Sequence, residues 1–418
     1  MVRSQLARGT SPGLTTGEGE RGPARRQFLA GAAAFAAAAP LVLRSAEAVT
    51  AKYRVGVIGH TGRGNYGHGL DTVWREVPGC QVAAVADADE KGLAAAVKRL
   101  GAPKGYADYR ELLDKEKPDL VSLCPRWLDQ HRDMVVAAAE RGVRGIYLEK
   151  PLCRTLAEAD EMAAACEKHG VKLAVAHQTR YSPRLPIVRE LLRSGALGRV
   201  LEFRGRGKED ARGGGEDLWV LGSHVLDLIL VLGGEPKSCF ATVLQEGRPI
   251  GKADVREGAE GIGPLAGDEV HATYRLASGA TATFDSVRKA GGGEPTRFGV
   301  QVFGSKGILE IYPGYPGDVC LLPDPSWSPG RTGKKWLPVT SGGVDKPEPL
   351  KAGGLDAGNL AAVKDLLAAV EGNRQPECHL GEARAATEMI VAVFESQRVG
   401  GPVAFPLENR QNPLAMLP

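Results

Sequence analysis

The sequence lacks the patterns that mark metal sites and disulfide frameworks. Its seven cysteines are scattered, and none forms a C-x-x-C pair or a zinc-binding pattern. The eight histidines include no H-E-x-x-H spacing. An odd number of cysteines, several within apolar runs, indicates free buried thiols. We therefore expect neither a metal centre nor a disulfide scaffold.

The sequence also has little excess charge. The formal net charge is +3, and residues 1–48 alone hold six Arg against three Glu. The remaining chain is therefore close to neutral, which favours neither a nucleic acid nor an anionic membrane as a partner. A chain of 418 residues with 43% hydrophobic and 25% charged residues is ordinary for a globular protein of two domains.

Residues 1–48 have the features of an export signal. Arg25-Arg26 precede an Ala-rich apolar stretch over about residues 29–43, and Ala46-Glu47-Ala48 is an A-x-A cleavage pattern. This arrangement resembles a twin-arginine signal, which predicts a periplasmic or cell-envelope location. The apolar stretch is shorter than the ~20 residues needed to span a bilayer, so we expect no membrane segment after cleavage. An uncleaved membrane tether is the alternative.

A glycine-rich turn after the first strand of the remaining chain predicts a nucleotide site. The apolar run Tyr53–Ile58 leads into this turn, and the residues that follow read as helical, which is the order of a phosphate-binding fingerprint. Strand 81–86 then ends at Asp87, where an acid bonds the adenosine ribose and favours NAD over NADP. The turn residues expected at the cofactor are Gly59, Thr61, Gly62, Arg63 and Gly64, with Thr61 in place of the middle glycine.

The order of strands and helices predicts two domains after the signal. Strand and helix patterns alternate over residues 49–176, which indicates an α/β Rossmann domain with a doubly wound parallel sheet. Residues 177–418 contain long alternating strands, which indicate an α+β domain with an open, mainly antiparallel sheet. An apolar helix, 221–232, interrupts these strands and carries His224 and Asp227 on one face.

The strand over residues 144–148 ends in Glu149-Lys150-Pro151. Ligands bind beyond the carboxyl ends of parallel strands, so a Lys there is a candidate acid/base group. Glu149 could hold it in place, and Pro151 fixes the backbone of the turn. A surface ion pair is the alternative.

Together these residues resemble the glucose–fructose oxidoreductase/inositol dehydrogenase/MocA (Gfo/Idh/MocA) family over about residues 52–407. The resemblance implies an NAD-dependent or NADP-dependent enzyme that oxidises or reduces sugars, polyols and related compounds. It also implies homo-oligomers formed through the C-terminal sheet. The motifs that carry it are the glycine turn, Asp87, Glu149-Lys150-Pro151, Arg180-Tyr181, Gly222-Ser223-His224, and Glu395-Ser396 with Gly400, Val403 and Pro406.

The resemblance assigns roles to several residues. Lys150 would contact the nicotinamide ribose and the reacting hydroxyl, and Glu149 would orient it. His224 would be a second acid/base group beside the substrate, and we expect Asp227 to orient His224. The remaining candidates are Pro125 and His131 at the cofactor, and Arg180, Tyr181 and Trp219 at the substrate, each with structural packing as the alternative.

One position departs from the family pattern. Many members have Asp two residues before the Gly of the Gly-x-His element, where this chain has Val220. Glu216 and Asp217 are candidates to supply the missing carboxylate. Three functions therefore stay open: an exported sugar oxidoreductase with a tightly bound cofactor, a glycoside hydrolase or lyase that oxidises its substrate transiently, and a non-catalytic sugar or nucleotide sensor.

Overall fold

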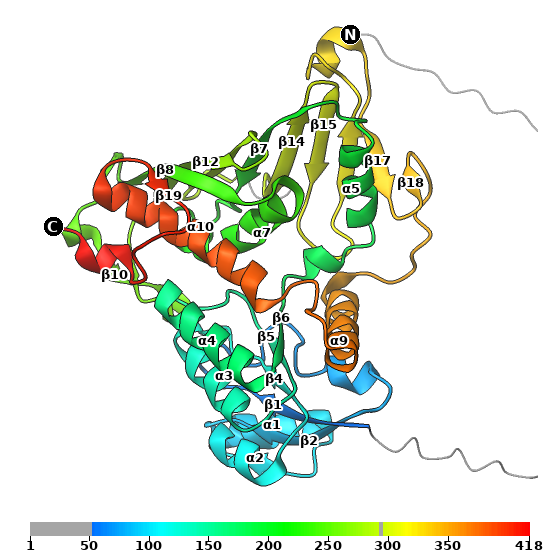
Figure 1. The fold of residues 1–418 in the computed structure, drawn as a ribbon, viewed down its shortest axis with the longest axis vertical. Helices are drawn as coiled ribbons and strands as arrows, with labels where there is room; N and C mark the ends of the chain where they lie inside the picture. Colours follow the sequence, from blue (N-terminus) through cyan, green and yellow to red (C-terminus); the bar gives the residue numbers. More distant parts are fainter. Residues whose placement is uncertain (1–51, 292–295) are drawn as a thin grey trace, which may run out of the picture. The chain divides into compact units, whose positions relative to one another are not determined.

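The computed structural model describes residues 52–291 and 296–418, which form two sheets with their helices (Figure 1). The predicted export signal, residues 1–48, lies outside the described residues. Within the described ranges, no helix has the length and apolar character needed to cross a membrane.

The N-terminal sheet is parallel throughout, as predicted. Its strands run in the order β3-β2-β1-β4-β5-β6, and every neighbouring pair is parallel. The central strands β1 and β4 are mostly apolar and buried, apart from Arg54 and Ser122, because helices cover both faces of a sheet of this kind. The strands are β1 (Tyr53–Ile58), β2 (Cys80–Ala86), β3 (Gly105–Tyr106), β4 (Leu120–Leu123), β5 (Gly145–Leu148) and β6 (Lys172–Val175).

Three of the four helices of the N-terminal sheet begin at a side-chain cap, and two of them end at a glycine. Asp89, Asp108 and Thr155 accept hydrogen bonds from the first turns of α1, α2 and α4, respectively. Gly101 and Gly170 end α1 and α4 in the left-handed conformation, with φ of 64° and 67°. The helices are α1 (Glu90–Leu100), α2 (Tyr109–Glu116), α3 (His131–Glu140) and α4 (Leu156–His169).

The helix expected after the glycine turn is not formed, so this prediction was wrong. Between β1 and β2 the chain makes successive turns and one short 3-10 segment, η1 (Val73–Glu76). Four glycines and an asparagine in this loop have positive φ, a conformation that cannot continue a right-handed helix. They are Gly62 (81°), Gly64 (91°), Asn65 (53°), Gly67 (63°) and Gly69 (84°).

A helix from the C-terminal part of the chain covers this face of the sheet instead. Helix α9 (Gly354–Gly372) packs on β5, β6 and η1, beside the sheet in Figure 1. Its residues Ala362, Val363 and Leu366 share a core with Val55 and Val57 of β1. The two halves of the chain are therefore interlocked through α9.

The C-terminal sheet is open and mainly antiparallel, as predicted. Its strands run in the order β18-β17-β16-β15-β14-β7-β13-β12-β8-β19, with β9 pairing β8, and only the β7–β13 pair is parallel among these described strands. The strands are β7 (Val200–Arg206), β8 (Pro236–Gln245), β9 (Arg248–Pro249), β12 (Glu269–Leu276), β13 (Thr281–Val287), β14 (Gly299–Gly304), β15 (Gly307–Ile311), β16 (Val319–Leu322), β17 (Leu337–Thr340), β18 (Gly343–Val344) and β19 (Val403–Ala404).

One face of this sheet is covered by the apolar helix α7 (Gly222–Gly233) and by α10 (Leu380–Val399) (Figure 1). Their apolar side chains form one continuous core with the inner residues of the strands. The remaining elements are α5 (Leu185–Arg193), α6 (Gly215–Val220), α8 (Pro329–Thr332) and the hairpin of β10 (Arg256–Glu257) and β11 (Pro264–Leu265).

Candidate functional site

An open cavity lies at one end of the carboxyl edge of the N-terminal sheet. Its volume is about 460 Å³, and its walls come from the ends of β1, β2 and β3 and from the start of α3. This position and size suit the adenosine half of a dinucleotide. The polar lining residues include His60, Arg63, Asp108, Arg110, Gln130 and Asp133.

Asp87 lies beside this cavity, but its carboxylate is engaged by the glycine loop. It accepts hydrogen bonds from the Thr61 backbone N (3.0 Å), Thr61 Oγ1 (2.7 Å), Tyr66 Oη (2.9 Å) and the Asp89 backbone N (3.0 Å). The residue is only 1% exposed. In this conformation Asp87 anchors the loop, and its carboxylate is not free for the ribose contact that we expected. Thr61, which replaces the usual middle glycine, supplies two of the four bonds.

Gly62, Arg63 and Gly64 form the next part of the glycine loop. A Cβ on Gly64 would lie 2.3 Å from the backbone N of Arg126, so this glycine is needed for close packing, whereas a Cβ on Gly62 would meet nothing within 4 Å. Arg63 is paired with Asp129 and lies over the Trp127 ring, 4.7 Å from its centroid. The residues present therefore fit the adenosine half of NAD. Without a helix N-terminus, the pyrophosphate would depend on Arg63 and on backbone N–H groups of the loop.

His131 and Pro125 have a structural role in this arrangement. The His131 ring is fully buried, with Nε2 2.7 Å from the Pro125 carbonyl oxygen and Nδ1 3.0 Å from those of Pro151 and Leu152. The histidine thus ties the end of β4 to the segment after β5. The cofactor contact expected for His131 is not available.

Glu149 also anchors the glycine loop. Its carboxylate accepts hydrogen bonds from the backbone N and the Nδ1 of His68, both at 3.1 Å, and from the backbone N of Lys150 at 3.0 Å. Burial alone would raise the pKa of Glu149, but His68 and the charge of Lys150 outweigh burial and lower the pKa below its usual value. The expected contact between Glu149 and the Lys150 amine is replaced by these bonds to backbone and His68.

Lys150 reaches from the end of β5 to the C-terminal domain. Its Nζ donates to the backbone carbonyl of Val220 at 3.0 Å, and the residue is only 8% exposed. The position at which the family pattern has Asp therefore contacts Lys150 through its main chain. Burial lowers the pKa of Lys150, although the charges of Glu149 and Glu260 oppose that shift. This change makes the amine a better base near neutral pH.

His224, at the start of α7, is half-buried. Burial, together with the nearby Lys150 and His177, holds the pKa of His224 well below its usual value. The imidazole is therefore neutral near neutral pH and can accept a proton. The centroids of the His224 and His177 rings lie 5.4 Å apart in an edge-to-face arrangement.

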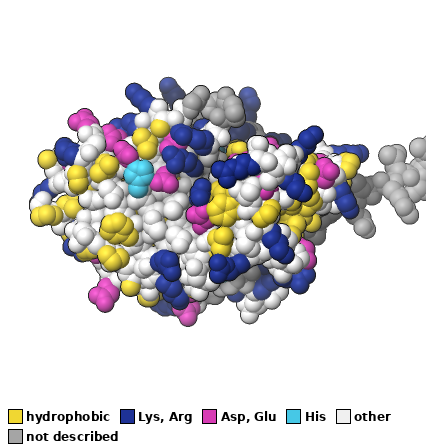
Figure 2. Space-filling view, turned by 90° about the horizontal axis from the view of Figure 1, so that it is seen from above, with side chains coloured by type: hydrophobic (Ala, Val, Ile, Leu, Met, Phe, Trp, Pro, Cys, Tyr) yellow, Lys and Arg dark blue, Asp and Glu magenta, His cyan; other side chains and the backbone are white. Residues whose placement is uncertain are grey.

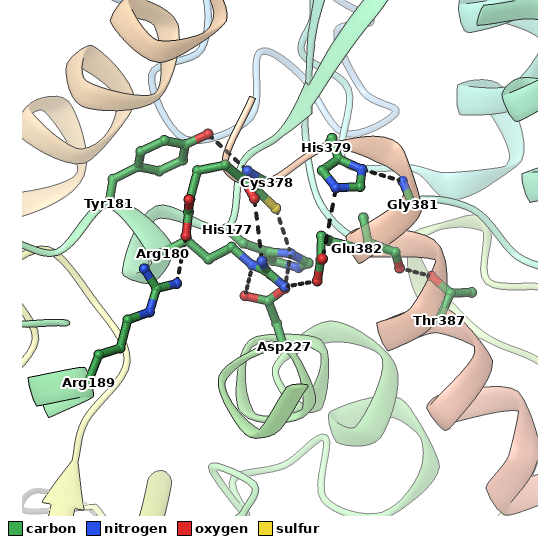
Figure 3. Close-up of polar contacts among 12 residues, drawn as sticks. His177, Arg180, Tyr181, Arg189, Asp227, Cys378, His379, Gly381, Glu382 and Thr387 are labelled. Carbon is green, nitrogen blue, oxygen red and sulfur yellow. Dashed lines mark hydrogen bonds and ion pairs between the residues drawn. The ribbon is translucent and has the colours of Figure 1, made fainter. Parts of the chain in front are cut away.

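From the sequence we expected Asp227 to orient His224. In the structure Asp227 binds other residues instead. Its carboxylate oxygens lie 2.8 and 2.9 Å from Nε of Arg180, and Arg180 Nη2 is 2.9 Å from Glu382 (Figure 3). His177 Nδ1 lies 3.4 Å from the same carboxylate of Asp227. Arg180 and Asp227 thus form a buried pair that joins the end of β6 to α7 and α10, in place of the substrate contact expected for Arg180.

The other two expected substrate residues also pack in the interior. The Tyr181 hydroxyl lies between Asp365 Oδ2 and the backbone N of Cys378, at 3.3 Å from each. Trp219 is 2% exposed and belongs to the core of the C-terminal domain. Both aromatic rings pack in the interior because they lie at the ends of buried elements. The sequence alone does not distinguish an aromatic residue in such a position from one that lines a substrate cleft.

Of the two candidates for the missing carboxylate, only Glu216 is partly accessible. Asp217 is buried and accepts hydrogen bonds from Ser286 Oγ (2.6 Å) and the Glu209 backbone N (3.0 Å), which gives it a structural role. Glu216 is half-buried, and burial raises its pKa above the usual value.

The structure also brings His68 and His177 to the site, which the sequence analysis did not single out. His177 directly follows the last parallel strand, so the rule that pointed to Lys150 applies to it equally. His68 had no such signal, because the loop that positions it was expected to be helical.

Two models of protein families match the sequence. One, described as an oxidoreductase family with an NAD-binding Rossmann fold, matches residues 53–177. The other, the GFO/IDH/MocA C-terminal domain, matches residues 187–310. Together they match about three fifths of the chain.

Individual relatives are similar over part of their length. D-apiose dehydrogenase of Paraburkholderia graminis is 38% identical over 125 residues, which are 30% of this chain and 33% of that protein. Levoglucosan dehydrogenase of Pseudarthrobacter phenanthrenivorans is 29% identical over 233 residues, which are 50% of this chain and 59% of that protein. The chain thus spans less than two thirds of the length of either relative.

The same fold occurs in a solved structure of levoglucosan dehydrogenase in complex with NADH and levoglucosan. The TM-score is 0.68 at 21% identity, over 85% of this chain and 99% of that one. With both family models matching in order, the chain belongs to the Gfo/Idh/MocA family of oxidoreductases, and its N-terminal domain is an NAD-binding Rossmann domain.

Proposed function

We propose that this chain is an exported NAD(P)-dependent oxidoreductase that acts on a sugar, polyol or sugar derivative. The observation that carries the proposal is the closeness of Lys150, which follows β5, to His224, at the start of α7. Lys150 Nζ binds the Val220 carbonyl just before α7, and the charge of Lys150 contributes to the lowered pKa of His224. Lys150 lies at the sheet edge whose other end holds the adenosine-sized cavity. The relatives named as D-apiose and levoglucosan dehydrogenases support a sugar-type substrate.

In this proposal, Lys150 and His224 move the hydroxyl proton of the substrate. A nicotinamide bound there would supply the hydride acceptor or donor. The neutral His224 ring can take the proton directly, and the buried Lys150 amine stabilises the developing alkoxide or takes the proton itself. The bond from Lys150 Nζ to the Val220 carbonyl uses only one of the N–H groups of the amine, so the nitrogen can still bind a substrate hydroxyl.

The experiment that tests the proposal uses the protein as purified. We expect mass spectrometry to find bound NAD or NADP, and we expect reduction or oxidation of that nucleotide by a panel of sugars and polyols. Asp87 is engaged by the loop, so both nucleotides belong in the test. A protein that binds neither nucleotide and transfers hydride to no member of the panel would contradict the proposal.

Export explains why the cofactor should stay bound. Free NAD is scarce outside the cytoplasm, and the twin-arginine route carries folded proteins with their cofactors. Arg25-Arg26 and the Ala46-Glu47-Ala48 pattern support this part of the proposal. Cell fractionation should find the wild type in the periplasm or envelope and the double variant Arg25→Lys, Arg26→Lys in the cytoplasm. An unchanged distribution would contradict export by this route.

A second candidate is a glycoside hydrolase or lyase that oxidises its substrate transiently. Oxidation at C3 of a sugar acidifies the C2 proton, so the glycosidic bond can be eliminated before the ketone is reduced again. Two observations favour it: Val220 lacks the usual carboxylate, and a second imidazole, His177, lies against His224. Cleavage of a glycoside with C2 deuterium exchange and no net reduced nucleotide would support this candidate over simple dehydrogenation.

We also propose that the chain forms homo-oligomers through the open face of the C-terminal sheet. This face carries a large exposed apolar side chain, Phe240 (53% exposed), beside the half-buried His271 and Asp285. Figure 2 shows basic, acidic and hydrophobic side chains interspersed over one side of the molecule. Light scattering should give a mass above that of one chain, reduced by Phe240→Lys.

A further inference from the structure

His177 has a buried ring nitrogen that the fold leaves unpaired. The residue is 2% exposed, and its Nδ1 faces Asp227 Oδ1 at 3.4 Å and Cys378 Sγ at 3.6 Å (Figure 3). Its Nε2 is also buried and finds no hydrogen-bond partner among the described residues. An unpaired polar atom in the interior is costly and needs an explanation.

The second imidazole of the site, His224, packs against this ring. His177 and His224 pack edge to face, with centroids 5.4 Å apart, so a side-chain rotation or one water would connect their nitrogens. Arg180 binds both oxygens of Asp227 and fixes the carboxylate on the other side of His177. These residues therefore form a row: Asp227, His177, His224.

We propose that Asp227, His177 and His224 form a proton relay in which His177 replaces the carboxylate that is missing at Val220. The proposal rests on the proposed oxidoreductase function. Asp227 keeps the proton of His177 on Nδ1, which leaves the lone pair of Nε2 free to accept a proton from His224. His177 is thus a positioning residue, because it acts on the substrate through His224.

The proton balance of the relay is simple. When one nitrogen of His224 takes the hydroxyl proton of the substrate, its other nitrogen donates its own proton to Nε2 of His177. His224 is then neutral again, and the positive charge lies on His177, now protonated on both nitrogens, where the carboxylate of Asp227 stabilises it. The charged and titratable groups around the two rings are Lys150 after β5, His68 in the glycine loop, Arg180 after β6, Asp227 on α7, and Cys378 and Glu382 at the start of α10.

The same side chains offer a rival arrangement. Ligand atoms of His177, Asp227 and Cys378 all lie within 4.8 Å of one another, as in a metal site. The Arg180 guanidinium already lies against both oxygens of Asp227 and would repel a second cation there. A metal on Nδ1 would also force the His177 proton onto Nε2, the opposite of what the relay requires.

The first test needs no turnover. In protein labelled with ¹⁵N-histidine, long-range ¹H–¹⁵N spectra report which nitrogen of each ring carries the proton. We expect His177 protonated on Nδ1 only, and we expect His177→Phe to shift the His224 resonances. A proton on Nε2 of His177, or one equivalent of zinc in the purified protein, would overturn the relay. This result stands even if no sugar substrate is found, so failure of the relay and failure of the proposed function can be told apart.

The second test is kinetic. His177→Phe should lower kcat by about 10- to 100-fold, the range for partners that orient a reacting group, with KM and nucleotide affinity unchanged. His177→Gln, whose amide oxygen can replace the Nε2 acceptor, should recover part of that loss and guards against a folding defect in the Phe variant. Cys378→Ala, which removes the other neighbour of Nδ1, should keep kcat within about twofold. Equal losses in all three variants would contradict a relay and indicate packing alone.

Discussion

The two ends of the carboxyl edge of the N-terminal sheet are built in opposite ways. The end formed by β1, β2 and β3 is hollow, with a cavity of about 460 Å³. The end formed by β5 and β6 is filled by side chains that are bound within the protein: Glu149 to His68, Lys150 to the backbone carbonyl of Val220, and Arg180 to Asp227.

This difference suggests that the hollow end binds the nucleotide and that the filled end carries out the reaction. The hollow end can take a ligand without rearrangement, whereas a substrate at the filled end meets side chains that are already bound within the protein. The bond to the Val220 carbonyl holds the Lys150 amine in place before a substrate arrives.

The reactive end depends on Lys150. Lys150→Met keeps the length of the side chain and removes the amine, so kcat should fall by about 10²- to 10⁴-fold, the usual contribution of an acid/base group. Nucleotide affinity should change little, because the hollow end is untouched. Lys168→Met, at an exposed position of α4, is the matched control. A Lys150 variant with wild-type kcat would remove the basis for placing the reaction here.

The filled end also depends on the buried ion pair. Arg180→Met leaves the carboxylate of Asp227 buried without its main partner, which should lower the free energy of unfolding by about 3–5 kcal/mol. Arg189→Met, which removes an exposed pair with Glu377, should cost no more than about 1 kcal/mol. Urea denaturation measures both. Similar small decreases in the free energy of unfolding of the two variants would mean that the Arg180–Asp227 pair does not stabilise this end of the sheet.

Nucleotide binding at the hollow end should depend on the volume of its cavity. Ala107 lines the cavity, so Ala107→Trp should weaken nucleotide binding about tenfold or more, by partly filling the space that the ligand needs. Stability should be unaffected, because this alanine is exposed. Ala95→Trp on the exposed face of α1 controls for the added ring. Calorimetric titration with NAD and NADP would decide, and unchanged affinity would place the nucleotide elsewhere.

A surface ion-pair cluster gives the smallest effect. His271 lies between Asp285 (2.6 Å) and Glu269 (2.7 Å). Burial opposes its protonation, but these two carboxylates outweigh burial and raise the pKa of His271. A raised folded pKa means that the pairs stabilise fully below about pH 6.5 and that this contribution is lost as pH rises through the folded pKa. Stability should therefore fall as pH increases in this range, less so in His271→Gln. Identical pH profiles would contradict this.

The sequence predicted most of the strands and helices, but it did not predict the conformation of the glycine loop or which helix covers it. Alternation and caps such as Asp89 and Gly170 are local signals, so the strands and helices follow from them. The prediction of a helix after the glycine turn failed because contacts distant in sequence hold the loop in another shape: Thr61 and Tyr66 bind Asp87, and Gly64 packs on Arg126 with a positive φ. The covering helix, α9, comes from a distant part of the chain, which no local pattern shows.

The candidate site divides in the same way. Lys150 and His224 were identified from their places at a strand end and a helix start, and the structure brings them to one region. The partners of these residues could not be predicted. Asp227 was assigned to His224, its neighbour on the helix, but binds Arg180 and His177 from another element. Which of several nearby groups a carboxylate binds depends on burial and on competing donors, and neither is visible in the sequence.

In the proposed reaction, hydride passes at the filled end between a sugar and the nicotinamide of a dinucleotide whose adenosine half is held by the hollow end. A single-turnover experiment with a sugar or polyol deuterated at its carbinol carbons, followed by mass analysis of the nucleotide, tests it most directly. The account predicts deuterium in the reduced nucleotide from the wild type and none from Lys150→Met, which still binds the nucleotide. Bound nucleotide without label in the wild type, across the panel, or equal label in both proteins would contradict it.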